Sequence, residues 1–381
     1  AGLAAELAQV MTNLRDFEDA LDKLRRWARE KRFQVGVQLL RRALDGAHAG
    51  AALADIAETA IAALLPRVEA DFARRHGRVP GGAFAVIGMG RLGSREMTLA
   101  SDLDLILIYD APPGTDSSDG PHPLQVSAYF ARLSQRLISA ITAATAEGRL
   151  YDVDMRLRPS GEAGPIASHF TGFARYQSES AWTWEHMALT RARPVAGDAQ
   201  LCRRISEVIA AVLCSPRDRE KLVIDVADMR RRIADENARP WRWDLRNRQG
   251  GLIDLEFIVQ FLMLRDAASA PQILHRGTAE AIAALGDAGL LPPKARHELG
   301  AAAVLFRNVQ EVLALLGDGS PAVGDLEEPD AATLAACVGA IDFARLDADI
   351  TDAAARVRSW YDRLIGQPAR RAAQERGEDA R

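Results

Sequence analysis

Residues 88–109, GMGRLGSREMTLASDLDLILIY, decide the fold, because two aspartates open a strongly apolar run. Asp102 and Asp104 are two positions apart, so in a β-strand both side chains point to the same face. Two neighbouring carboxylates repel each other and lose their hydration at high cost beside the apolar residues 105–108. A divalent cation between them removes this cost, and Mg²⁺ prefers carboxylate, water and phosphate oxygens as ligands. The stretch therefore predicts a strand that begins with a magnesium-binding pair of carboxylates.

A second aspartate pair lies further along, in residues 150–158, LYDVDMRLR. Charged and apolar residues alternate here, so a strand would place the charged ones on one face: Asp152, Asp154, Arg156 and Arg158. We expect this strand to pair with the first one, which would bring Asp154 to the other two carboxylates. Its arginines would then neutralise phosphate groups. The alternative is a pair of solvent-facing edge strands with scattered charges.

The remaining sequence predicts helices on both sides of a small sheet. Residues 83–87 (AFAVI) are a short apolar run that predicts another buried strand, and residues 124–147 carry apolar side chains at helical spacing. We therefore predict an α+β fold. Its expected parts are a helical segment at 1–78, a catalytic core at 79–197, a helical bundle at 198–366 and a disordered tail at 367–381.

Composition excludes several classes of protein. The 381 residues carry a net charge of −4, which does not favour binding to nucleic acid. No run reaches the roughly 18 apolar residues of a membrane helix, and the acidic, amphipathic start does not resemble a signal peptide. The three cysteines match no disulfide or metal framework, as expected in the reducing cytoplasm. Because the chain starts at alanine, we expect a fragment of a longer protein.

The glycines at 88, 90 and 93 allow a different hypothesis. They satisfy the GxGxxG pattern of a dinucleotide-binding Rossmann unit, and Asp110 has the approximate spacing of a ribose-binding acid. This alternative predicts an NAD-dependent oxidoreductase. However, only the eight residues 94–101 separate Gly93 from Asp102, too few for the crossover that joins parallel strands. A buried parallel strand also has no use for an aspartate pair at its start.

The Gly93-Ser94 turn and the aspartate pair after it resemble the signature of polymerase-β-like nucleotidyltransferases. Longer motifs resemble one family of that superfamily, the glutamine synthetase adenylyltransferases. These motifs follow the family's order at residues 84–109, 151–161, 181–186 with 191–193, and 250–257. Ser94 departs from the family, which often has glycine there, but serine is the commoner superfamily choice. The resemblance implies a small mixed sheet with helices, preceded by helices and followed by a C-terminal helical bundle.

The resemblance also implies an activity and partners. The family's full-length enzyme has two related domains, one adding AMP to a tyrosine of glutamine synthetase and the other removing it by phosphorolysis. The string WTWEH at 182–186 is similar to the adding domain, so adenylylation is expected and removal is the alternative. The nitrogen-signal protein PII and glutamine would control the full-length protein. The presence of one catalytic unit agrees with a fragment.

Roles for individual residues follow from the resemblance. ATP is expected to bind with its triphosphate against the glycine-rich turn formed by Gly88, Gly90, Gly93 and Ser94. Asp102 and Asp104 would bind one Mg²⁺ and, with Asp154, a second, as in-line attack on the α-phosphate requires. Asp154 would also position the tyrosine hydroxyl, and Arg156 or Arg158 would neutralise phosphate charge.

Further candidates have structural alternatives of similar weight. A pair of residues, Glu185 and His186, can be either part of the site or a buried hydrogen-bonded pair. Arg191 and Arg193 can reach the cleft or form salt bridges, and Asp254 and Glu256 can touch the nucleotide or complement a helix dipole. The residues alone identify neither the nucleobase nor the acceptor. A non-catalytic interaction module is a third hypothesis, which the intact carboxylate set disfavours.

Overall fold

The fold is built on an antiparallel strand pair, β1 (Ala83–Gly88) and β2 (Leu103–Asp110), in a computed structural model that describes residues 2–237, 243–317 and 328–377. The register pairs Ala83 with Asp110 and Gly88 with Leu105. The five-residue helix α4 (Gly90–Ser94) lies in the connection. Antiparallel pairing is incompatible with a Rossmann βαβ unit, so the dinucleotide-binding alternative is excluded. The predicted α+β class is confirmed.

Three further strands complete a mixed sheet of order β3-β2-β1-β5, with β4 also beside β2. Strand β5 (Arg193–Gly197) is antiparallel to β1, while β3 (Val153–Asp154) and β4 (Ser168–His169) run parallel to β2. Both β1 and β2 are almost completely buried, which explains their near-continuous apolar sequences. The helices between these strands are α5 (Val126–Thr142), α6 (Phe170–Glu179) and α7 (Thr183–Leu189), and α8 (Ala199–Leu213) follows β5.

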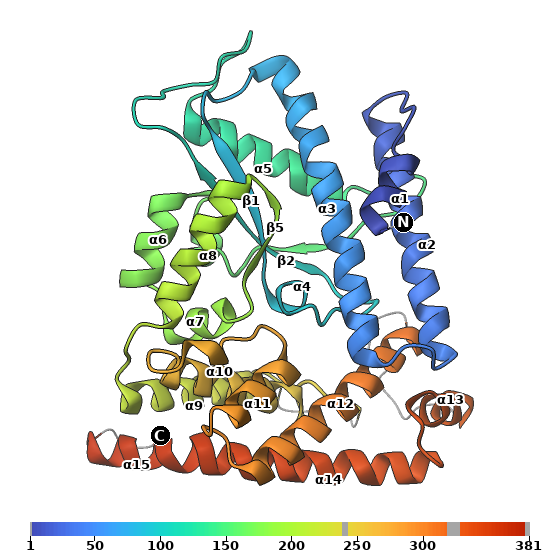
Figure 1. The fold of residues 1–381 in the computed structure, drawn as a ribbon, viewed down its shortest axis with the longest axis vertical. Coiled ribbons are helices and arrows are strands. Elements are labelled where there is room, and N and C mark those ends of the chain that lie inside the picture. Colours follow the sequence, from blue (N-terminus) through green and yellow to red (C-terminus); the bar gives the residue numbers. More distant parts are fainter. Residues whose placement is uncertain (1, 238–242, 318–327, 378–381) are drawn as a thin grey trace.

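The N-terminal helices lie along one side of the sheet (Figure 1). They are α1 (Leu3–Val10), α2 (Phe17–Leu40) and α3 (Gly46–His76). Asp16 and Asp45 cap α2 and α3, and Gly77 ends α3 with a positive φ of 69°. Helix α3 packs against β5 and α5, and near its start against α12 (Pro293–Leu316). By length and composition α3 and α12 are the two described helices that could cross a membrane, but α3 is mostly buried as a core helix.

The C-terminal helices gather at one end of the molecule, beyond α4 and α7 (Figure 1). Besides α12 they are α9 (Arg219–Glu236), α10 (Leu252–Asp266), α11 (Thr278–Asp287), α13 (Glu328–Val338), α14 (Phe343–Tyr361) and α15 (Gln367–Glu375). A π-helical turn, Asp362–Gly366, joins α14 to α15. Helix α10 is buried almost all round and forms the centre of this group.

Two predictions were wrong in extent. Residues 150–158 are not one strand, because only Val153–Asp154 pair with β2. The Asp154 carboxylate accepts a hydrogen bond from the Arg156 amide at 2.8 Å, and this local turn ends the strand. Residues 367–375 of the expected disordered tail form α15 instead, since Ala369 and Ala372 are buried and the helix packs against α9. Residues 378–381 lie outside the described part of the chain.

Candidate active site

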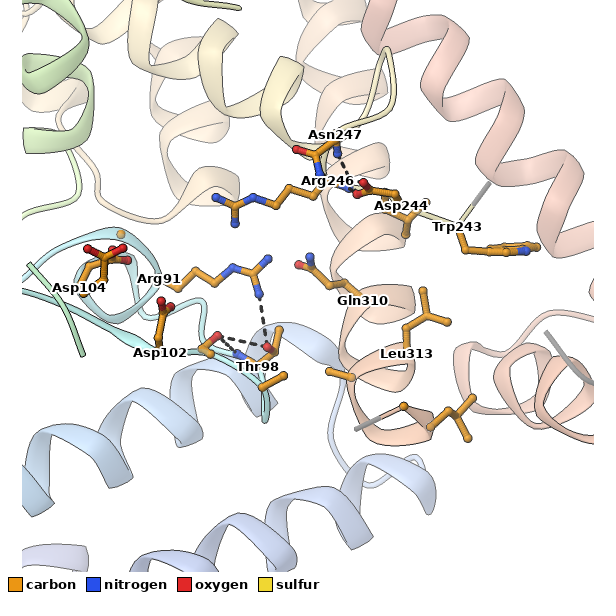
Figure 2. Close-up of a pocket in the computed structure, with 18 of the residues that line it drawn as sticks. Arg91, Thr98, Asp102, Asp104, Trp243, Asp244, Arg246, Asn247, Gln310 and Leu313 are labelled. Carbon is orange, nitrogen blue, oxygen red and sulfur yellow. Dashed lines mark hydrogen bonds between the residues drawn. The ribbon is translucent and has the colours of Figure 1, made fainter. Parts of the chain in front are cut away.

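The strands bring the three aspartates to one cavity. Strand β3 pairs with the start of β2 so that Asp104 lies in register with Asp154, and Asp102 directly precedes β2. These carboxylates line one end of a cavity of about 580 Å³ between the sheet, the segment before α10, and α12. Figure 2 shows Asp102 and Asp104 at this end of the cavity. The juxtaposition expected from the two aspartate pairs is therefore present.

Negative charge accumulates at Asp104. Burial, followed by the charges of Asp102 and Asp154, raises the pKa of Asp104 to about 6. No hydrogen bond to its carboxylate occurs within the described residues. Asp154 differs, because the Arg156 side chain hydrogen-bonds its carboxylate, with Nε at 2.7 Å, and lowers its pKa. Of these two carboxylates, Asp154 is hydrogen-bonded to an arginine and Asp104 is not.

These carboxylates fit a magnesium ion in chemistry. Hard oxygen donors suit Mg²⁺, and a divalent charge would relieve the repulsion that raises the pKa of Asp104. Among the described residues, no three acidic, histidine or cysteine side chains form a ready-made metal cluster. The third carboxylate, Asp154, is held in an ion pair with Arg156. Asp102 and Asp104 are therefore the better-prepared ligands.

The glycine-rich turn shapes the cavity floor. Gly90 has a positive φ of 49°, and a side chain there would collide with the carboxylate of Asp104. Gly93 is equally constrained, because a Cβ atom would strike a carbonyl of the segment before β5. Of the four predicted contributors only Gly90 lines the cavity, whereas Gly88, Gly93 and the buried Ser94 do not. The turn therefore brings backbone close to Asp104.

Several cavity residues were missed by the sequence analysis. Arg91 and Arg246 extend into the middle of the cavity (Figure 2). Arg91 hydrogen-bonds Thr98 at 3.3 Å, and the Arg246 charge acts to lower the pKa of Asp104. Residues 243–247 and Gln310 on α12 form the opposite wall. The motif quoted at 250–257 begins directly after that segment, and this proximity was the one available signal.

Arg158 does not reach the cavity. Its guanidinium donates to the carbonyls of Met155, Glu162 and Gly164, at 2.9, 3.1 and 3.4 Å. It therefore stabilises the loop after β3. Arg156, with its side chain 76% exposed, is the arginine of this motif that lines the cavity.

Glu185 and His186 form a structural pair at the start of α7. Glu185 accepts hydrogen bonds from the Tyr176 hydroxyl at 2.8 Å and from the Trp182 amide at 2.9 Å, which satisfies a free amide at the start of α7. His186 donates from Nε2 to the Gln177 carbonyl at 2.8 Å, and burial lowers its pKa. Neither residue lines the cavity.

Arg191 links the cavity to a buried ion network. It lines the cavity and pairs with Glu256 at 3.0 Å and with Glu96 at 3.5 Å. Glu96 also pairs with Arg307 of α12 at 2.9 Å. Burial alone would raise the pKa of Glu96, but Arg307 and Arg191 lower it to about 2. Glu256 therefore contributes by holding Arg191 in place.

The last two candidates lie away from the cavity. Arg193 pairs with Glu58 of α3 at 2.6 Å and donates to the Gly93 carbonyl at 3.2 Å, which ties the glycine turn to α3. Asp254 is completely buried and pairs with Arg230 of α9. Both residues therefore stabilise the fold around the site.

Comparisons with known proteins identify the family of this chain. The family model described as glutamate-ammonia ligase adenylyltransferase matches residues 1–208, and that of GlnD PII-uridylyltransferase matches residues 224–365. Curated relatives named bifunctional glutamine synthetase adenylyltransferase/adenylyl-removing enzyme include those of Xanthobacter autotrophicus, 43% identical over 366 residues, and Mesorhizobium japonicum, 44% identical over 369 residues. Each alignment covers 96% of this chain and 37% of the relative, so the chain spans little more than a third of their length. Because the first family model covers more than half of its residues, the chain belongs to the glutamate-ammonia ligase adenylyltransferase family.

Proposed function

We propose that this chain transfers AMP from ATP to a tyrosine hydroxyl of glutamine synthetase in the cytoplasm. The observation that carries the proposal is the register of Asp104 with Asp154, beside Asp102, in a cavity that also contains Arg91 and Arg246. Carboxylates for a metal and guanidinium groups for phosphates are the two requirements of nucleotidyl transfer. The printed name of the relatives supports glutamine synthetase as the acceptor.

The transfer is an in-line displacement at the α-phosphorus. The tyrosine oxygen forms a bond to phosphorus, the bond to the β-phosphate oxygen breaks, and pyrophosphate leaves with that electron pair. Arg91 and Arg246 hold and neutralise the phosphates from the middle of the cavity. Asp154, whose pKa Arg156 lowers, is ionised at neutral pH, so its carboxylate can orient the tyrosine hydroxyl and take up its proton as the bond to phosphorus forms.

Asp102 and Asp104 would hold Mg²⁺, and Asp154 would join them after its ion pair with Arg156 opens. A bound magnesium ion supplies charge neutralisation at the phosphates and lowers the pKa of a coordinated hydroxyl. Such help matters because a free tyrosine hydroxyl has a pKa near 10.

The direct test is incubation with purified glutamine synthetase, Mg²⁺ and ATP labelled at the α-phosphate. We expect label on one tyrosine of the acceptor, located by peptide mass spectrometry, and little transfer from GTP or UTP. Absence of label with an active acceptor would overturn the proposal. Omission of Mg²⁺ and the Asp104→Asn variant serve as controls.

The direction of the reaction needs its own assay, because the relatives' name includes an adenylyl-removing activity. We propose that this chain carries the adding reaction, and that PII controls the longer protein. The chain should release little ADP from adenylylated glutamine synthetase in the presence of phosphate. Robust phosphate-dependent release would show that the removing reaction belongs to these residues.

A further inference from the structure

The cavity has two chemically different ends. In Figure 2, Arg91 and Arg246 separate the carboxylates from Gln310, Leu313 and Trp243. The far end, called the base subsite here, has the apolar side chains of Trp243 and Leu313 beside the amide of Gln310 (Figure 2). Metal and phosphate chemistry uses nothing at that end.

The walls of the base subsite are firmly placed. Gln310, Leu313 and Ala314 are three and four residues apart on α12, so they share one face of that helix. Trp243 is 3% exposed, and its ring packs on Phe343 of α14 at 4.8 Å between centroids. This subsite therefore exists before any ligand binds.

One polar atom in the base subsite lacks a partner. Gln310 Oε1 is buried and accepts no hydrogen bond from the described residues. Nearby Asp244 is already occupied, since its carboxylate accepts from the Asn247 side chain at 2.7 Å and from the Arg246 and Asn247 amides. A buried unpaired acceptor costs free energy, and such groups are usually satisfied by a ligand or water. The vacant hydrogen-bonding capacity belongs to Gln310.

We propose that this subsite binds the purine base of the nucleotide and that Gln310 selects adenine. The proposal rests on the function proposed above. A purine has two flat apolar faces and a polar edge, which match apolar walls with a single amide. A glutamine amide offers an acceptor beside a donor, which fits the amino group and N7 of adenine. At the same edge guanine presents two acceptors, O6 and N7, so Gln310 Oε1 would remain unpaired against it.

The test is equilibrium binding of Mg-ATP and Mg-GTP to the 381-residue chain, with no acceptor protein present. Gln310→Leu keeps the side-chain size but removes the amide, and it also removes a buried unpaired atom, so the fold should be retained. We expect at least about tenfold weaker ATP binding and a smaller change for GTP. Gln200→Leu, an exposed glutamine on α8, is the matched control and should change neither affinity.

A second variant tests the apolar walls. Leu313→Ala should weaken ATP and GTP to a similar extent, because both purines present the same flat faces. Equal ATP and GTP affinities in the unmodified chain, or an unchanged preference in Gln310→Leu, would overturn the proposal. If the two variants instead raise the KM for glutamine synthetase and leave ATP binding unchanged, the subsite binds the acceptor protein and the proposal is overturned.

Failure of the two proposals can be distinguished. If Gln310→Leu shifts ATP binding but no AMP reaches glutamine synthetase, the base subsite stands and the acceptor is wrong. If the unmodified chain and Gln310→Leu both transfer AMP with the same preference for ATP over GTP, the proposed function stands and Gln310 does not select the base.

Discussion

Asp104 and Glu96 are both largely buried carboxylates near the same glycine turn, yet their pKa values move in opposite directions. Asp104 faces two other aspartates, and its pKa rises to about 6. Glu96 faces Arg307 and Arg191, and its pKa falls to about 2. Burial acts in the same direction on both, so the sign is decided by which charges lie nearby.

This difference separates a functional charge from a structural one. The Glu96 carboxylate has its hydrogen-bonding capacity filled by Arg191, Arg307 and the Thr278 amide. It joins the glycine turn to the C-terminal helices, and it has nothing left to offer a ligand. Asp104 is short of positive charge, which is a poor arrangement for stability and a good one for binding a cation. Replacing the carboxylate with a neutral amide should therefore impair activity at Asp104 without loss of stability, and should lower stability at Glu96.

The largest effect is expected for Asp104→Asn. We predict a loss of AMP transfer of about a thousandfold or more, because the barrier depends on charge at the phosphates. Without divalent cation the variant should be as stable as the unmodified chain, or more so, since a repulsive charge is removed. Transfer assays and thermal denaturation measure the two properties. Retention of more than about a tenth of the rate, a change below about 1.4 kcal/mol, would contradict the role of Asp104.

Glu96→Gln should show the opposite pattern. Removing this charge leaves Arg191 and Arg307 without a shared buried partner, so the free energy of unfolding should fall by about 3 kcal/mol. Urea denaturation at pH 7 measures this loss. Asp55→Asn is the matched control, because its ion pair with Arg95 is exposed and should be worth less than about 1 kcal/mol. If Glu96→Gln and Asp55→Asn lost the same free energy of unfolding, the buried ion network of Glu96 would be no more stabilising than an exposed ion pair.

Glu311 is a third buried carboxyl group, which has arginines nearby but accepts no hydrogen bond from them. Both its oxygens are buried without hydrogen bonds in the described residues, and burial raises its pKa to about 8. The charged groups facing it are Arg307 on α12, Arg91 on α4 and Glu96 in the loop after α4. Its carboxyl is therefore protonated in the folded chain at neutral pH.

The sign of the pH effect follows from linkage. The unfolded chain releases the Glu311 proton near pH 4.5 and the folded chain releases it near pH 8. The protonated Glu311 carboxyl therefore contributes to the free energy of unfolding. This contribution is complete below about pH 4.5 and is lost as pH rises through about 8. Glu311→Gln removes this dependence, so its stability relative to the unmodified chain should rise by more than about 1.4 kcal/mol between pH 5 and pH 8. Parallel denaturation curves at the two pH values would show that Glu311 titrates normally.

The smallest effect is expected at Asp152, which shares the DVD motif with Asp154. Its side chain is 70% exposed and pairs with Arg149, away from the cavity. Asp152→Asn should change the rate of AMP transfer by less than about twofold, whereas Asp154→Asn should reduce it severely. The initial rate at saturating ATP distinguishes them. A large loss in Asp152→Asn would show that the active site extends beyond the three proposed carboxylates.

Much of the central region could be predicted because its signals are local. Asp102 and Asp104 share a strand face by their spacing alone, and the short connection after Gly93 already disfavoured a crossover. The prediction of one strand over residues 150–158 was wrong for a local reason, which the alternation of charged and apolar residues does not reveal. The Asp154 side chain competes for the Arg156 amide and turns the backbone. Helix α15 was missed because its stability comes from packing against α9.

The sequence by itself determined the α+β class, the aspartate pair and the family, since these depend on residue spacing and on motifs of neighbouring residues. Tertiary structure alone decided which charges are structural and which face the cavity. Gln310 and Arg246 lie far along the chain from Asp104, and packing of α12 and of the segment before α10 brings them to one cavity. A side chain's pKa and accessibility depend on such long-range neighbours, which no local pattern records.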